Sequence, residues 1–172
     1  TRLEIMDILE DDAGVLVPVP WNDPHWSIRA RSTAWLDPSD QSNAKHLIDL
    51  ARKDVHSEVR ASAISRLAGS EYSGFIELAM ERLEHEQAYN VIHETIEGLQ
   101  TRDQQSAKLA IEKMEKDASV TATMITGGYY ARTGSIDRLS FFEKTWDRIN
   151  GMPRLLHIKH YVDVLHLADE QQ

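Results

Sequence analysis

The stretch NDPHWSIRARSTAWL, residues 22–36, has a spacing of acidic, apolar and basic residues that returns in KDVHSEVRASAISRL, residues 53–67. In each stretch an apolar residue follows the acidic residue at a distance of five, and a large apolar residue follows it at thirteen. The same frame begins again at two further acidic residues, so the intervals between its starts are 31, 32 and 31 residues. A repeat of this length is typical of stacked helical units, each of which buries its apolar face against its neighbours.

The four frames differ in detail but share this spacing. Within the second frame, Val59, Ala63 and Leu67 recur every four residues, as one face of an α-helix requires. At the first start, Asp23 and Pro24 predict an N-cap followed by proline at the first helical position. The frames are Asp23…Ile28-Arg29…Leu36, Asp54…Val59-Arg60…Leu67, Glu86…Val91-Ile92…Leu99 and Asp117…Ala122-Thr123…Tyr130.

Further helical patterns lie between and around the frames. We therefore predict an all-α fold, a HEAT-like α-solenoid of about five helical hairpins with no sheet. Residues 1–172 are expected to form a single helical-repeat domain, with a partial first unit and linker in 1–22 and the repeats in 23–168. The additional helices are predicted at 2–9, 44–52, 74–83, 104–115, 137–149 and 155–168.

The frame resembles a HEAT repeat, in which an aspartate at the turn and an arginine six residues later form a ladder between neighbouring units. The arginine is present at Arg29 and Arg60, whereas Ile92 and Thr123 replace it in the later frames. The resemblance therefore implies a ladder that stops halfway along the chain. The structural residues of the frame are then Asp23, Arg29, Asp54, Arg60, Glu86 and Asp117.

Composition excludes several classes of protein. With 28 acidic against 19 basic residues the net charge is −9, which argues against a nucleic-acid binder because that function needs a concentrated basic face. The apolar runs are too short for a membrane span, and the absence of cysteine excludes disulfides, thiolate metal sites and thiol nucleophiles. The chain begins with Thr1 instead of Met, so we interpret it as a piece of a larger protein.

Histidines are the natural candidates for a metal site. The dipeptide His93-Glu94 lacks the second histidine of a zinc-protease helix. On the last predicted helix, His157 and His160 are three residues apart and could chelate a metal, but we favour exposed or interface histidines there. No catalytic, cofactor-binding or metal residue is therefore predicted in this chain. His166 belongs to the same helix, and Asp163 is the carboxylate at a matching step.

Two further features have alternative interpretations. Gly127 and Gly128 lie inside a helical pattern, where each costs about 1 kcal/mol. They indicate a close approach of two helices, with Tyr129 and Tyr130 packing alongside, and a ligand-facing notch is the alternative. Three tryptophans near a proline-rich segment either seal the end of the solenoid or form an interface with a neighbouring domain. They are Trp21, Trp26 and Trp35.

Several segments resemble the C-terminal helical domain of bacterial gluzincin zinc aminopeptidases, the membrane alanyl aminopeptidase-like family. They are NDPHWSIRARSTAWL, DVHSEVRASAISRL and YYARTGSIDRLSFFEKTWDRINGMPRLLHIKHYVDVL, within residues 20–167. In that branch a YA-x-x-G step follows a repeat helix, and an FFE helix and a final helix come next.

The resemblance implies a parent enzyme, exported in bacteria, that binds zinc through H-E-x-x-H and a downstream glutamate in a domain upstream of Thr1. Its zinc-activated water would remove N-terminal residues from peptides. This chain would be non-catalytic, pack on the catalytic domain and limit access of the peptide substrate. The alternative is a stand-alone HEAT-like scaffold that binds a protein or peptide partner, with a preference for basic partners.

Overall fold

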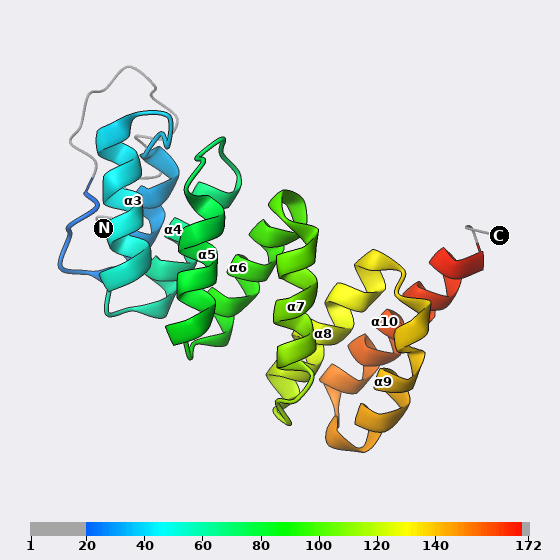
Figure 1. The fold of residues 1–172 in the computed structure, drawn as a ribbon. Coiled ribbons are helices and arrows are strands. Elements are labelled where there is room, and N and C mark those ends of the chain that lie inside the picture. Colours follow the sequence, from blue (N-terminus) through cyan, green and yellow to red (C-terminus); the bar gives the residue numbers. More distant parts are fainter. Residues whose placement is uncertain (1–19, 170–172) are drawn as a thin grey trace. The chain divides into compact units, whose positions relative to one another are not determined.

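The computed structural model describes residues 20–169, which form helices joined by short connectors and contain no strand (Figure 1). The predicted all-α class is therefore confirmed. The chain forms two compact units, unit 1 up to Gln104 and unit 2 from Gln105. A continuous solenoid and a single domain over residues 1–172 stay predictions, and the helix predicted at residues 2–9 lies outside the described residues.

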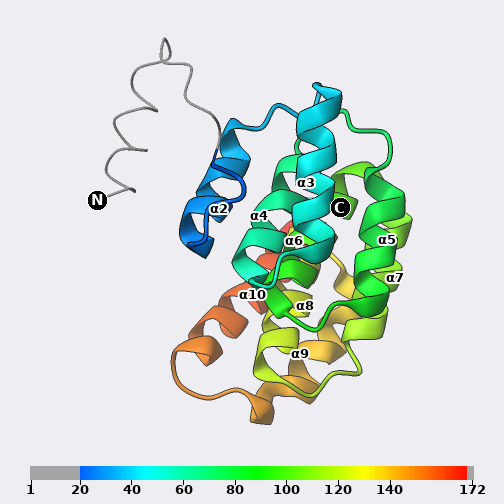
Figure 2. The same ribbon diagram turned by 90° about the vertical axis from the view of Figure 1, so that its left-hand side faces the viewer.

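Unit 1 contains two layers of helices. Helix α4 packs between α2 and α6, while α3 packs on α4 and α5 packs on α6. Figure 2 shows α2, α4 and α6 following one another, with α3 and α5 alongside. The helical hairpins predicted from the frames thus stack on each other within this unit. The elements are α2 (Trp26–Ser32), the 3-10 helix η1 (Thr33–Trp35), α3 (Gln41–Lys53), α4 (Ser57–Ala68), α5 (Phe75–His85) and α6 (Tyr89–Arg102).

The apolar positions of the frame form the core of unit 1. Each frame contributes one residue near the start of its helix and one near or just beyond the end, and all are at most 4% exposed. Burial of six such side chains supplies the hydrophobic contribution that holds neighbouring hairpins together. These residues are Ile28, Leu36, Val59, Leu67, Val91 and Leu99.

The acidic starts shape the turn before each frame helix. The carboxylate of Asp23 accepts the backbone N–H of His25 at 2.8 Å, and Asp54 and Glu86 accept from the residue two positions on in the same way. His25 has extended dihedral angles and is itself the N-cap of α2. The prediction of Asp23 as the N-cap and Pro24 as the first helical residue is therefore wrong, because the bent segment at Asp23 continues through His25 before the helix begins.

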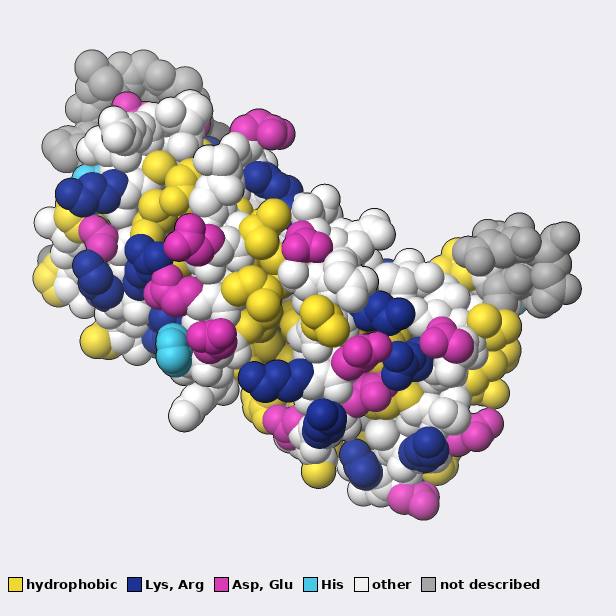
Figure 3. Space-filling model, in the orientation of Figure 1, with side chains coloured by type: hydrophobic (Ala, Val, Ile, Leu, Met, Phe, Trp, Pro, Cys, Tyr) yellow, Lys and Arg dark blue, Asp and Glu magenta, His cyan; other side chains and the backbone are white. Residues whose placement is uncertain are grey.

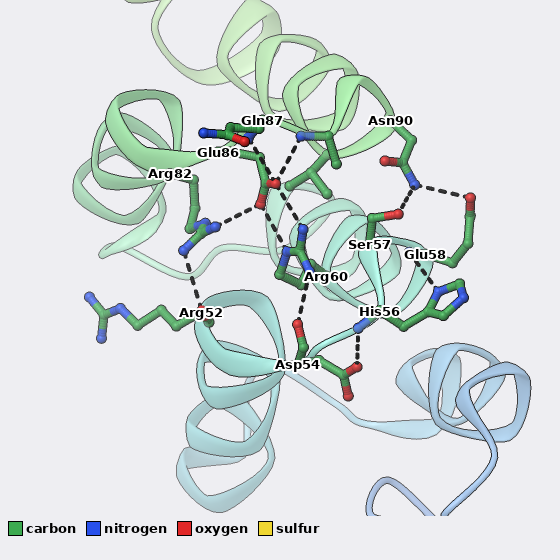
Figure 4. Close-up of polar contacts among 12 residues, drawn as sticks. Arg52, Asp54, His56, Ser57, Glu58, Arg60, Arg82, Glu86, Gln87 and Asn90 are labelled. Carbon is green, nitrogen blue, oxygen red and sulfur yellow. Dashed lines mark hydrogen bonds and ion pairs between the residues drawn. The ribbon is translucent and has the colours of Figure 1, made fainter.

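Two arginines connect the successive repeats. Arg29 donates from Nε and Nη2 to the carboxylate of Asp54, at 2.6 and 2.8 Å, and from Nη1 to the carbonyl of Asp23 at 2.8 Å. Arg60 donates in the same way to Glu86, at 2.9 and 2.8 Å, and to the carbonyl of Asp54 at 2.9 Å (Figure 4). The two rungs implied by the HEAT resemblance are present.

A second set of arginines reaches back to the preceding repeat and was not predicted. Arg66 donates to the carbonyl of Leu36 at 3.0 Å, and Arg82 to the carbonyl of Arg52 at 3.3 Å. Arg102, at the end of α6, donates to the carbonyl oxygens of the connector that follows α4. The accepting carbonyl groups lie at the end of η1, in the last turn of α3 and in the connector after α4, so these arginines tie the helix ends and connectors of one repeat to the next.

Glu86 is the most enclosed acid of the ladder, with a side chain that is 4% exposed. Burial opposes its ionisation, but hydrogen bonds from Arg60, from the N–H of Ala88 and from Arg82 outweigh burial and lower its pKa to about 2. Figure 4 shows the carboxylate between the two guanidinium groups. Glu86 is therefore a buried carboxylate that stays ionised because Arg60, Arg82 and the N–H of Ala88 surround it.

Unit 2 is built around the pair α8 and α10, with α9 packed on both. The fourth frame starts as the others do, since Asp117 accepts the N–H of Ser119 at 2.8 Å. The helix predicted at 137–149 is a short α-helix between two 3-10 turns. The elements are α7 (Gln104–Met114), α8 (Val120–Thr133), η2 (Ile136–Arg138), α9 (Leu139–Thr145), η3 (Trp146–Arg148) and α10 (Met152–Asp169).

We predict that Arg60→Met destabilises the protein by about 3 kcal/mol, because it leaves the buried carboxylate of Glu86 short of one of its two cations. Arg52→Met is the matched control: its pair with Glu81 is about 40% exposed and is expected to contribute less than about 1 kcal/mol. Urea unfolding followed by circular dichroism measures both. Equal losses in the two variants would contradict a structural role for the ladder.

We also predict that Gly98→Ala costs about 1–3 kcal/mol, because overpacking forces a shift in the core. A Cβ at Gly98 would lie 2.4 Å from the ring of Phe75 and 2.6 Å from the Cβ of Ala68. Gly69→Ala is the control, since its nearest contact would be an ordinary 3.6 Å. Thermal unfolding of the two variants should differ by several degrees, and a Gly98→Ala protein as stable as the parent would refute this close packing.

Candidate functional site

An open groove of about 580 Å³ crosses the frame helices of unit 1. Its lining comes from α2 and η1, from α4 and from α6, so three successive repeats contribute to one surface. Much of the lining on the first two repeats consists of small residues, which leave room for a chain to approach the helices closely. They are Ala30, Ala34, Ala61, Ser62, Ser65 and Gly69.

Equivalent frame positions lie in rows across this groove. The residues eight positions after the acidic starts are Arg31, Ser62 and Glu94. The stacking of the repeats therefore gives one row that begins with a cation on α2 and ends with an anion on α6. The row of residues one position earlier is Ala30, Ala61 and His93.

Hydrogen bonds organise the α6 side of the groove. Asn90 donates from Nδ2 to the carboxylate of Glu58 at 3.0 Å and to the hydroxyl of Ser57 at 3.3 Å, which joins α6 to α4 (Figure 4). His93 lies 3.7 Å from Glu94 and 3.4 Å from Glu97, measured from its ring nitrogens. The groove thus offers an amide, hydroxyls, an imidazole and charges of both signs, which are the groups that bind a polypeptide backbone and its side chains.

His93 and Glu94 line the groove, although no motif in the sequence predicts a functional role for them. As a dipeptide they lack the second histidine of a zinc-protease helix, and nothing else in their spacing points to a site. Only their position within the repeat could have predicted this role: when α6 is aligned with α4, they correspond to Ala61 and Ser62, which also line the groove. Among residues 20–169 no group of three or more histidine, aspartate and glutamate side chains is placed to hold a metal ion.

The three tryptophans predicted to form an end seal or an interface do not form one cluster. Trp21 stacks on His46 of α3, with ring centroids 4.0 Å apart, and Trp26 stacks on His56 before α4, also at 4.0 Å. Trp35 is half-buried at the end of η1. Trp21 and Trp26 therefore contact neighbouring segments of unit 1, and a role for the three tryptophans as an interface stays a prediction.

The histidines of α10 have three different environments. His157 is 1% exposed, so its placement among exposed or interface histidines is wrong, while His160 is half-buried and His166 is exposed. His157 Nε2 lies 3.1 Å from the Thr145 hydroxyl and 3.3 Å from the carbonyl of Phe142. Because that hydroxyl donates to the Phe141 carbonyl at 2.7 Å, a proton on Nε2 is the arrangement that satisfies both contacts. The Nδ1 atom is buried and has no hydrogen-bond partner among the described residues.

The two glycines of α8 allow these histidines to approach. A Cβ at Gly127 would lie 3.3 Å from the ring of Phe142, 3.3 Å from His160 Nδ1 and 3.6 Å from His157 Nδ1. The prediction of close packing is confirmed at Gly127, where side chains of α9 and α10 occupy the space. A Cβ at Gly128 would meet only ordinary contacts of 3.4–3.8 Å with Arg132 and His160, and Gly128 lines an open cavity of about 430 Å³, so the notch alternative stays a prediction there. Tyr129 and Tyr130 are both buried beside this contact.

Comparisons of the chain with protein-family models, with curated proteins and with solved structures found no match. Within residues 20–169, every helix is too short or too polar to cross a membrane. The resemblance to zinc aminopeptidases is thus carried by the quoted segments alone.

We predict that unit 2 loses stability as the pH falls below about 6.5, the ordinary histidine pKa. Burial lowers the pKa of His157, and the bond to Phe142 offsets this only in part; burial also lowers the pKa of His160. Folding therefore favours the neutral imidazoles, and their contribution is present at higher pH and is lost on acidification.

The measurement is urea unfolding at a series of pH values, followed by the fluorescence of Trp146 in a variant whose other tryptophans are phenylalanine. His157→Gln should flatten the pH dependence, because glutamine keeps an amide donor but does not titrate. His166→Gln, at an exposed position of the same helix, should leave the dependence unchanged. A profile that His157→Gln leaves as steep as before would show that this imidazole does not govern acid stability.

Proposed function

We propose that this chain is a non-catalytic helical-repeat module that binds an extended polypeptide in the groove of unit 1. The observation that carries the proposal is the alignment of equivalent positions of α2, α4 and α6 along one open groove lined by small residues. A bound chain that crosses the helices would meet the same frame position at each repeat. Stacked helical repeats form extended binding surfaces of this kind.

The charges along the groove support an orientation for the bound chain. Arg31 marks the α2 end, Glu94 lies on α6, and Glu58 of α4 is bonded to α6 through Asn90. Arg66 of α4 also lines the groove, but its Nε is bonded to the Leu36 carbonyl at the α2 side. A polypeptide with an acidic group near α2 and a basic group near α6 would pair with both. The net charge of −9 adds a general attraction for basic partners, which raises the rate of association more than the affinity.

The resemblance to zinc aminopeptidases suggests a specific partner. The polypeptide would then be the catalytic domain of the parent chain, or a peptide on its way to the zinc in that domain. Two of the segments that carry the resemblance form α2 with η1 and α4, which supply most of the groove lining. An H-E-x-x-H motif upstream in the parent reading frame would support this partner, and a regulatory or second repeat domain there would favour a free-standing scaffold.

We predict that Ser65→Tyr abolishes selection of binders from a displayed library of random linear peptides, because the ring fills the groove. Peptides selected on the unmodified chain should lose at least about tenfold in affinity for the variant, about 1.4 kcal/mol. The control is Ser73→Tyr, at an exposed position in the connector before α5 and outside the groove lining.

The row of Arg31, Ser62 and Glu94 provides a second test with the same peptides. Glu94→Arg should shift selection from basic toward acidic residues at the peptide end that contacts α6. Enrichment of no peptide at all, or affinities that Ser65→Tyr leaves unaltered, would argue that the groove of unit 1 is not a polypeptide site.

A further inference from the structure

Helix α10 exposes a stripe of apolar side chains on one flank. Leu155, Ile158, Val162 and Leu165 are 37–61% exposed, and their spacing of three, four and three residues places them on one face of the helix. Val164 and His157 lie on another face, where they are buried within unit 2. Helix α10 therefore has more apolar side chains than its packing within unit 2 buries.

A groove lies beside this stripe, between α10 and the segment of α9 and η3. It has a volume of about 470 Å³, and its apolar lining includes Phe142, Trp146, Ile158 and Tyr161. Arg154 holds Trp146 in place, since its guanidinium lies 4.9 Å from the ring centroid and donates to the Trp146 carbonyl at 3.1 Å. In Figure 3, hydrophobic side chains gather on the flank of unit 2 next to the C-terminal end of the described chain.

Two carboxylates add negative charge to the groove. Glu143 and Asp147 are exposed, line it one helical turn apart, and are paired with no cation among the described residues. Lys159 of α10 is not among the lining residues and is occupied by Asp163 at 2.6 Å. The surface thus combines an apolar floor with an acidic edge, so an occupant needs an apolar face and an adjacent positive charge.

The packing of unit 1 indicates what kind of element fits such a face. There, α4 has a helix on either side of it, α2 and α6. In unit 2, α10 packs on α8, and its stripe provides a further face with the spacing that helices use to contact each other. An amphipathic helix laid along a groove is a common mode of recognition.

We propose that the stripe and the α9–α10 groove form a docking site for an amphipathic helix of a partner protein that carries lysine or arginine beside its apolar face. The site uses none of the residues of the groove in unit 1. It therefore does not rest on the proposed function, and either site can fail while the other stands.

The probe is a fluorescent, covalently helix-stabilised peptide with leucines at alternating spacings of three and four and lysines beside them. Its binding to the full chain is measured by fluorescence anisotropy. Val162→Asp should weaken binding about thirtyfold, as expected for loss of a central apolar contact. Val55→Asp is the matched control, because Val55 is 93% exposed in unit 1 and its change should leave binding unaltered. Circular dichroism verifies that both variants are folded.

A charge-reversed pair tests the acidic edge. The variant Glu143→Lys with Asp147→Lys should bind the lysine peptide about tenfold more weakly and should gain affinity for a peptide whose lysines are replaced by glutamates. Equal binding of the lysine peptide by Val162→Asp and the parent would overturn the proposal. So would sedimentation showing that the chain forms a dimer through this stripe, one that Val162→Asp dissociates and that excludes the peptide.

Discussion

The architecture of unit 1 depends on a guanidinium group that binds two repeats at once. Arg29 and Arg60 each donate to the carbonyl of the acidic residue in their own repeat and to the carboxylate in the next. The planar fork of arginine matches a carboxylate in a fixed geometry, whereas apolar contacts are non-directional. Hydrophobic burial therefore holds the hairpins together, and the arginines fix their register. The groove exists because this register brings equivalent residues of three helices into line.

Unit 2 uses aromatic rings in place of the ladder. Tyr130, Phe141 and Phe142 contact one another in sequence edge to face, and the imidazole of His157 packs against Phe142 with centroids 5.0 Å apart. The third frame has Ile92 where the earlier ones have arginine, and the division between the units follows the helix that contains it. The aromatic packing thus begins where the frame arginines end, and unit 2 keeps one arginine link outside the frame, from Arg138 to Glu112 and Glu115.

The sequence predicted features that depend on spacing and missed those that depend on the backbone. The acidic starts, the buried positions and the two arginine–carboxylate pairs follow from residue types at fixed intervals. The bonds of Arg66, Arg82 and Arg102 do not, because any residue supplies a carbonyl. The helix start near Asp23 is not predictable, because the extended conformation of His25 has no marker in the sequence. Nor is the burial of His157, because α10 is apolar on several faces and its pattern does not identify the face that packs.

The shared arginine also makes the repeat modular in the sense used in protein engineering. A segment running from Asp54 to His85 begins with an acceptor for the preceding arginine and contains Arg60, a donor for the following acid. A tandem copy of this segment would restore both partners at each junction, so an array could be lengthened there without inventing an interface. A copy that starts at Glu86 would supply the carboxylate that accepts from the preceding arginine, but Ile92 stands where the next donor arginine is needed. The array could therefore not be extended beyond that copy.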